Sequence, residues 1–185
     1  MIDDLDRTLK KLLEQEIEDN IYFDAPDDQF APSTPAVDLF LYDVRENRDL
    51  RNNEWQMNRR SDGTAAKKHP PVRVDCSYLV TSWASDVYGE HLLLSKVMRV
   101  LLRYPILPSE ILQGSLVGQE PPLPTAVLQP GRLQSMGEFW QALGGKPKAA
   151  LHYTVTIGME AQESVEAEKP VTDKMLKFKV GAEEE

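Results

Sequence analysis

Apolar residues recur every three or four positions at the start of the chain. This spacing predicts a helix over residues 2–18 with a single apolar stripe. The stripe consists of Ile2, Leu5, Leu9, Leu12, Leu13 and Ile17. Asp3, Asp4 and Asp6 in the first turn complement the helix dipole. Because a full apolar stripe is stable only when buried, we expect this helix to dock on the rest of the protein.

Three further segments alternate apolar and polar residues with the two-residue period of β-strands. They span residues 37–44, 72–83 and 151–159. The first places Leu41 on one face and Phe40 and Val44 on the other. Apolar side chains on both faces predict a strand that is covered on both sides. In the second segment, Cys76 belongs to the more apolar face.

A second long helix is predicted over residues 85–104, with Ser85 as its N-cap and Pro105 as its stop. Its buried stripe is expected to consist of Leu92, Leu93, Val97, Val100 and Leu101. Residues 108–117 indicate a short helix or turn. The Pro and Asp content of residues 24–35 is typical of a loop.

The composition of the chain changes after Glu160. We therefore divide it into a folded domain over residues 1–160 and an acidic linker with a C-terminal extension over residues 161–185. The extension has apolar residues that could form a short terminal strand, namely Met175, Leu176, Phe178 and Val180. Within the domain, residues 61–69 are expected to form a turn or loop.

Length and charge narrow the possible functions. A chain of 185 residues can bury a core without disulfide or metal staples. The net charge of −9 disfavours a general nucleic-acid binder. No apolar run approaches the ~20 residues of a membrane helix, so no direct membrane insertion is expected. The charged, amphipathic N-terminus does not resemble a signal peptide, which predicts synthesis and assembly in the cytoplasm.

Motifs that carry chemistry are missing from the sequence. It contains no Gly-rich phosphate loop, nucleophile elbow or zinc helix. Cys76 with Asp75 and His69 could form the thiol site of a small hydrolase, but a buried core cysteine is the favoured interpretation. The histidines lack metal-ligand spacing, and the aspartates of residues 24–28 lack the frame of a calcium loop. We therefore expect no catalytic residue, metal or cofactor.

An arginine-rich segment surrounds Trp55. The arginines that we take as interface candidates are Arg45, Arg48, Arg51 and Arg59. Trp and Arg are enriched at binding hot spots, so this segment could be an interface arm. Trp55 could equally anchor the segment on the protein's own core, and the two alternatives carry equal weight.

Trp140 poses the same choice. It lies on a predicted helix over residues 136–143, which Ser135 caps and a Gly-Gly pair ends. A Pro-rich loop that contains Pro122 precedes this helix. Pro122 and Trp140 are interface candidates, although the helix stop favours a core position for Trp140.

Several unusual sequence segments follow one another along the chain in a recognisable order. After the N-terminal helix they are STPAVDLFLYDVRENRDLRNNEW, PPVRVDCSYLVTSWA, EHLLLSKVMRVLLRYPILP, GQEPPLPT and GEFWQALGGKPKAALHYTVTI. Together they resemble the N-terminal domain family of cap, or tail-terminator, proteins of phage-tail-like contractile injection systems. The resemblance covers residues 1–159.

This resemblance implies an α/β (α+β) fold, with a mixed, mainly antiparallel sheet packed by helices. It also implies structural work rather than catalysis. Such a cap is a homo-hexameric ring that ends the inner tube, stops its polymerisation and anchors the last sheath layer. Its partners are the sheath protein and the inner tube protein. A baseplate or adaptor component of the same machine is the alternative.

A cyclic ring needs two different contact patches on each subunit. The segment of residues 45–60 and the Pro-rich loop before Trp140 are the two candidates in this sequence.

Overall fold

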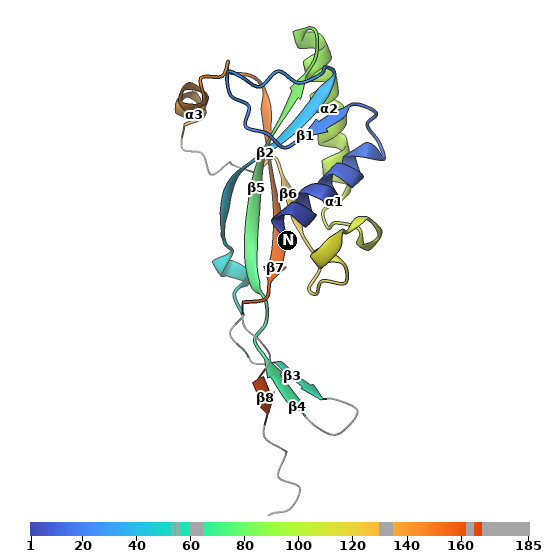
Figure 1. The fold of residues 1–185 in the computed structure, drawn as a ribbon, viewed down its shortest axis with the longest axis vertical. Helices are drawn as coiled ribbons and strands as arrows, with labels where there is room; N and C mark the ends of the chain where they lie inside the picture. Colours follow the sequence, from blue (N-terminus) through green and yellow to red (C-terminus); the bar gives the residue numbers. More distant parts are fainter. Residues whose placement is uncertain (53, 55, 60–64, 130–134, 162–164, 168–185) are drawn as a thin grey trace, which may run out of the picture. The chain divides into compact units, whose positions relative to one another are not determined.

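The computed structural model describes most of the chain. The described residues are 1–52, 54, 56–59, 65–129, 135–161 and 165–167. The chain divides into two compact units, which are considered separately (Figure 1). The first comprises Met1–Arg51 and Pro71–Met159, and the second comprises Asn52–Pro70 and Glu160–Glu185.

A five-stranded sheet forms the framework of the first unit. In spatial order its strands are β1 (Asn20–Tyr22), β2 (Ala36–Glu46), β5 (Val72–Trp83), β7 (Ala150–Met159) and β6 (Thr125–Val127). Only the β1–β2 pair is parallel. The predicted fold class, a mixed and mainly antiparallel sheet packed by helices, is therefore confirmed.

The helices of the first unit lie on both sides of this sheet (Figure 1). They are α1 (Ile2–Glu14), α2 (Val87–Arg103) and α3 (Met136–Leu143), with three short 3-10 turns. The turns are η1 (Arg48–Leu50), η2 (Ser109–Ile111) and η3 (Gly114–Leu116). In the described ranges, no helix is long and apolar enough to cross a membrane.

The second unit contains a three-stranded antiparallel sheet. Its strands, in spatial order, are β3 (Gln56–Arg59), β4 (Ala65–Lys68) and β8 (Val165–Ala167). The prediction of a loop over residues 61–69 is wrong for Ala65–Lys68, which form β4. This strand carries two lysines, and its short length gave no clear alternation in the sequence. The expected terminal strand near residues 175–180 lies outside the described residues.

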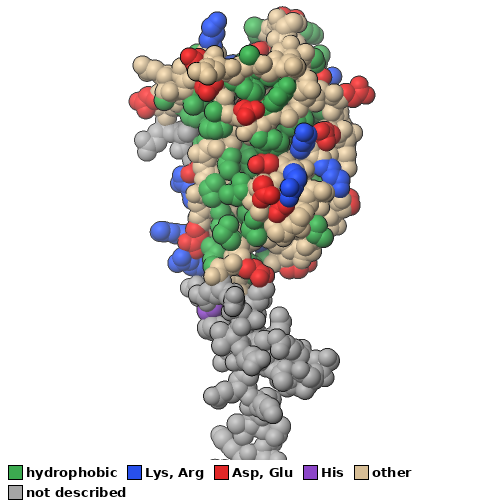
Figure 2. Space-filling model, viewed as in Figure 1, with side chains coloured by type: hydrophobic (Ala, Val, Ile, Leu, Met, Phe, Trp, Pro, Cys, Tyr) green, Lys and Arg blue, Asp and Glu red, His purple; other side chains and the backbone are tan. Residues whose placement is uncertain are grey.

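One face of the first unit's sheet carries the main hydrophobic core. Strand residues such as Leu39, Cys76 and Tyr153 are fully buried there. The apolar stripe of α1 packs into the same cluster, as its sequence pattern predicted. The Tyr78 hydroxyl in addition donates a 2.8 Å hydrogen bond to the Asp6 carboxylate, which joins α1 to the middle of β5. The outer side of α1 remains polar, with charges of both signs gathered over it (Figure 2).

Three details of these elements differ from the sequence predictions. The first helix ends at Glu14 rather than residue 18. Asp86, and not Ser85, caps α2 by accepting a 2.8 Å bond from the Gly89 amide. A bulge at Tyr42 shifts the register of β2. Val44 therefore pairs with Cys76 and lies on the same face of the sheet as Leu41, whereas the sequence pattern placed it on the opposite face with Phe40.

The buried stripe of α2 also differs from the prediction at one position. Leu93, Val97, Val100 and Leu101 are buried, but the Leu92 side chain is 51% exposed. Three consecutive leucines begin at residue 92, and a helix can turn only part of such a run toward its core.

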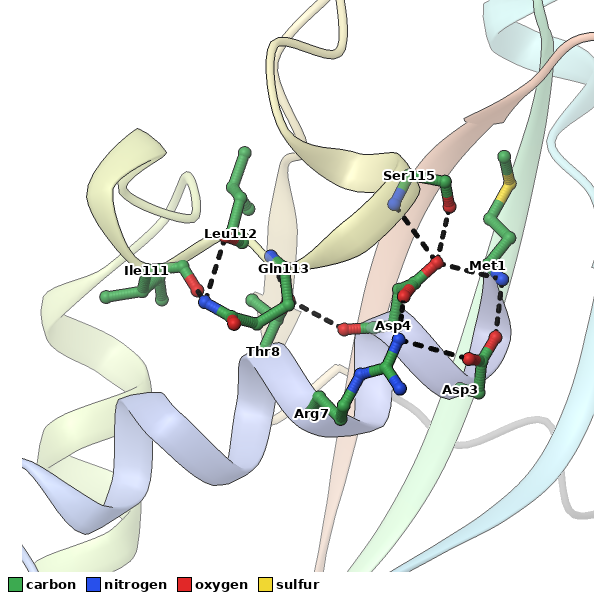
Figure 3. Close-up of polar contacts among 9 residues, drawn as sticks. All are labelled: Met1, Asp3, Asp4, Arg7, Thr8, Ile111, Leu112, Gln113 and Ser115. Atoms are coloured by element: carbon green, nitrogen blue, oxygen red, sulfur yellow. Dashed lines mark hydrogen bonds and ion pairs between the residues drawn. The ribbon is translucent and has the colours of Figure 1, made fainter.

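A polar clamp joins the start of α1 to η3 (Figure 3). The buried Asp4 carboxylate accepts bonds from the Ser115 hydroxyl at 2.6 Å and from the Ser115 amide at 3.1 Å. It also contacts the Met1 ammonium group and the Arg7 guanidinium. The Ser115 bond, with the cations beside it, holds the pKa of Asp4 well below its usual range.

Gly114 lets the chain approach this carboxylate closely. Its φ is +53°, and a Cβ atom at this position would lie 1.9 Å from Oδ1 of Asp4. Gly118 provides a matched comparison, because its φ is +71° while nothing lies within 4 Å of a Cβ there.

We expect Gly114→Ala to destabilise the protein far more than Gly118→Ala. Both variants pay the left-handed backbone strain of about 1 kcal/mol. Only Gly114→Ala also drives a methyl group into Asp4, which raises its total cost to about 3 kcal/mol. Denaturant unfolding of the two variants measures the difference. Equal free energies of unfolding for the two variants would show that Asp4 can move away from the added methyl group at little cost, and would contradict this prediction.

Candidate assembly surfaces

The structure divides the predicted interface residues between the two units. Arg45 lies on β2, while Arg48 and Arg51 lie at η1. Arg59 is the last residue of β3 in the second unit. Trp55 lies outside the described residues. The predicted arm over residues 45–60 is therefore not one continuous element.

Residues 43–51 form a corner, here called the β2–η1 corner, where β2 ends and turns into η1. Asn47 fixes the turn: its side-chain oxygen caps η1 by accepting from the Leu50 amide at 3.2 Å. Its amide nitrogen donates to the Asp75 carboxylate at 3.0 Å. Thr156 donates to the same carboxylate at 2.7 Å, so the corner is bonded across β5 to β7.

Two of the three arginines at this corner have partners within the subunit. Arg45 makes a two-pronged contact with Asp43, at 2.6 and 2.7 Å. Arg51 contacts Glu46 in the same way and at the same two distances. Among the described residues, Arg48 has no carboxylate within ion-pair distance. Arg48 is therefore the arginine of this corner that is free to bind a partner.

A hollow of about 630 Å³ lies at the β2–η1 corner. Residues 43–49 and Asp75 line it, which places four carboxylates and two guanidinium groups around it. The Val44 and Leu50 side chains beside it are nearly half exposed. The corner thus combines exposed apolar side chains with a slight excess of negative charge, whereas the sequence suggested a basic arm.

The Pro-rich loop is fastened to β5 by a buried arginine. The Arg73 guanidinium donates to the carbonyl oxygens of Pro121 and Pro122, at 3.2 and 3.0 Å. Burial lowers the pKa of Arg73. Gln119 also exchanges two hydrogen bonds with the backbone of Gly158. These bonds hold Pro122 at the surface, where its ring is exposed.

α3 covers part of the second face of the sheet. Ser135 caps it and Gly144 ends it with a φ of +68°, as the sequence predicted. Trp140 is only 3% exposed, in agreement with the core interpretation. Phe139 packs against Phe40 of β2, with 6.2 Å between the ring centroids.

The loop between β1 and β2 rests on the same side. A Cβ atom on Gly145 would lie 2.7 Å from the Pro26 carbonyl oxygen, so loop and helix end are in close contact. The Asp24 amide donates at 3.1 Å to Asp38, a fully buried aspartate of β2. The other carboxylate oxygen of Asp38 has no hydrogen-bond partner among the described residues. Burial raises the pKa of Asp38 to about 7.

Cys76 lies in the hydrophobic core. Its side chain is fully buried, and burial raises the pKa of the thiol to about 11. Asp75 lies on the opposite face of β5, where Asn47 and Thr156 occupy its carboxylate. The arrangement therefore opposes formation of the thiolate that a cysteine hydrolase requires.

Polar groups on the second face of the sheet pair with one another. The Tyr42 hydroxyl and the His152 ring are 3.1 Å apart, and so are the hydroxyls of Ser77 and Thr154. In the part of the chain that the structure describes, no group of His, Cys, Asp or Glu side chains could hold a metal ion. This face is therefore a hydrogen-bonded surface and not a recognisable reaction site.

The sequence matches the family described as the Pvc16 N-terminal domain over residues 4–173. The chain belongs to this family. Because the match spans nearly the whole chain, it confirms the resemblance found from the sequence strings. Among proteins with curated descriptions, none matches the sequence.

Two solved structures are similar to this Pvc16 N-terminal domain. One is the PVC sheath/tube terminator of an extracellular contractile injection system in the extended state. The two chains are 26% identical, the match covers 98% of this chain and 64% of the terminator, and the TM-score is 0.75. The other is the tube-terminating cap of the anti-feeding prophage, with 28% identity, coverages of 96% and 61%, and a TM-score of 0.67. The chain thus spans less than two thirds of each of these proteins.

The raised pKa of the buried Asp38 predicts that the stability of this Pvc16 N-terminal domain depends on pH. The folded protein holds a proton on Asp38 up to about pH 7, whereas the unfolded chain releases it near 3.8. This contribution to stability is therefore complete below pH 3.8 and is lost as the pH rises toward 7.

Asp38→Asn removes this titration. We expect the free energy of unfolding of the native protein, relative to the variant, to fall by up to about 4 kcal/mol over that range. Denaturant titrations at several pH values measure it. A difference that is independent of pH would show that Asp38 is ionised in the folded protein.

Proposed function

We propose that the protein is the terminator cap of a contractile injection system. The observation that carries this proposal is the similarity to a sheath/tube terminator over 98% of the chain, at 26% identity and a TM-score of 0.75. A tube-terminating cap of a second system matches almost as well. Two such proteins with a shared role favour the cap over a baseplate or adaptor component.

In this proposal the protein forms a homo-hexameric ring on the last layer of the inner tube and sheath. The ring ends tube growth and anchors the sheath when it contracts. Its work is mechanical, so affinity for neighbouring subunits takes the place of catalysis. Assembly takes place in the cytoplasm, and the protein remains part of the particle afterwards.

The features of the first unit suit such a role. Its helices are fixed to the sheet by a large core and by the Tyr78–Asp6 bond, while the Asp4–Ser115 clamp joins α1 to η3. Arg73 and Gln119 hold residues 119–122 of the Pro-rich loop against β5 and β7. A subunit whose loops are held in place loses little entropy when it joins an assembly.

Co-assembly with the sheath, tube and baseplate proteins tests the proposed function. Without the cap we expect tubes of uncontrolled length, and with it tubes of uniform length. Negative-stain images of labelled protein should show the label at the end opposite the baseplate. A label at the baseplate end would instead identify an adaptor, and a monomer that never copurifies with tube or sheath would refute the proposal.

Arg48 at the β2–η1 corner offers a more local test. We expect Arg48→Glu to weaken co-assembly about ten-fold, which corresponds to about 1.4 kcal/mol, without lowering the melting temperature. The subunit keeps its stability because the Arg48 side chain forms no ion pair with any described residue. Arg48→Lys, which keeps the charge, is the control and should assemble nearly normally. Normal assembly of the Arg48→Glu variant would show that the β2–η1 corner is not an assembly interface.

A further inference from the structure

The outward side of α2 exposes apolar side chains in a regular row. Tyr88 is 80% exposed, and Leu92 and Leu102 are 51% and 50% exposed. Together with Ser95 and Arg99, they follow steps of four, three, four and three residues. This is the spacing with which a helix presents one continuous seam to a partner. These five residues and Lys96 are here called the α2 outer face.

The α2 outer face also carries the unpaired positive charges of this helix. Lys96 and Arg99 form no ion pair among the described residues. Arg103, one turn further along, is already bound to Glu16. The chain as a whole has a net charge of −9, whereas Lys96 and Arg99 place two unpaired positive charges beside exposed apolar side chains. The surface that covers them is expected to be acidic.

A matching acidic surface lies on the same chain. Asp24, Asp27 and Asp28 fall within five residues of the β1–β2 loop, here called the acidic loop. None of the three is ion-paired among the described residues, and Asp24 and Asp28 are exposed. The loop is held in place by the contact of Pro26 with Gly145 and by the bond from the Asp24 amide to Asp38.

The two surfaces lie on opposite sides of the subunit. α2 packs against the core face of the sheet, whereas α3 and the acidic loop beside it lie on the second face (Figure 1). An α2 outer face therefore cannot reach the acidic loop of its own chain. It can reach the acidic loop of a neighbour that is placed beside it in the same orientation.

We propose that the α2 outer face of one subunit docks on the acidic loop of the next copy. Two different patches on opposite sides of a subunit produce a head-to-tail contact, which is the contact that closes a ring. The exposed side chains of Tyr88, Leu92 and Leu102 supply apolar area, and Lys96 and Arg99 supply the charge that selects the register. This inference rests on the proposed function, because it identifies the contact that forms the proposed ring.

A charge exchange between two variants tests the contact. Variant A carries Lys96→Glu and Arg99→Glu, and variant B carries Asp24→Lys and Asp28→Lys. Each variant alone brings like charges together at every contact, so we expect at least a ten-fold loss of assembly. In an equimolar mixture, the altered helix of A meets the altered loop of B, and the native helix of B meets the native loop of A. Every contact is then complementary, and rings of alternating A and B should form.

The measurement is native mass spectrometry of particles that are capped by the native protein, by A, by B or by the mixture. The control Lys10→Glu with Lys11→Glu makes the same charge change on the outer side of α1 and should assemble normally. Recovery in the mixture shows that both variants are folded. If the control also fails, net charge decides assembly and the proposed contact is wrong.

The other outcomes separate the contact from the function. If A and B both assemble alone, the ring forms through other surfaces and the inference is overturned while the cap remains. If A fails alone and is not incorporated in the mixture, while B assembles alone, α2 binds the tube or the sheath instead of a second copy. If the native protein itself never assembles, the proposed function fails before the contact is tested.

Discussion

Burial of one face of the sheet is the constraint on which the rest of the first unit depends. α1 contributes four leucines with no exposed surface, and α2 adds a second row of buried side chains against β5 and β6. Burial of each such side chain stabilises a fold by roughly 2 kcal/mol. Because α1 and α2 cover most of this face, the Asp4–Ser115 clamp and the Tyr78–Asp6 bond are partly buried beneath them. The positions of α1 and α2 follow from this arrangement.

The second face of the sheet has a different character. α3 and the β1–β2 loop cover only part of it, and its remaining polar side chains pair across the strands. Those pairs leave few groups free for chemistry, while the loops at the margins present exposed charges and apolar side chains. Such a division, with a closed core on one side and fixed but exposed margins on the other, suits a subunit that works by contact.

The similarity to two terminators shows that this sheet recurs in proteins that end tubes. Their shared fold does not by itself identify the residues that make contacts in an assembly. For this chain, charge pairing within the subunit is the more direct guide. Arg45 and Arg51 are already bound to carboxylates, whereas Arg48, Lys96 and Arg99 form no ion pair with a described residue.

The sequence alone determined the elements whose pattern is local. The period of α1, the exact alternation of β5, the Ser135 cap and the Gly144 stop could all be predicted, because each depends on neighbours along the chain. Only the tertiary structure decided the bulge at Tyr42, the outward position of Leu92 and the partners of Arg45 and Arg51. These features depend on which face a neighbouring strand or helix covers, and on which carboxylates the fold brings within reach. Composition and periodicity do not contain that information, because packing between distant segments chooses among several arrangements that the same local pattern allows.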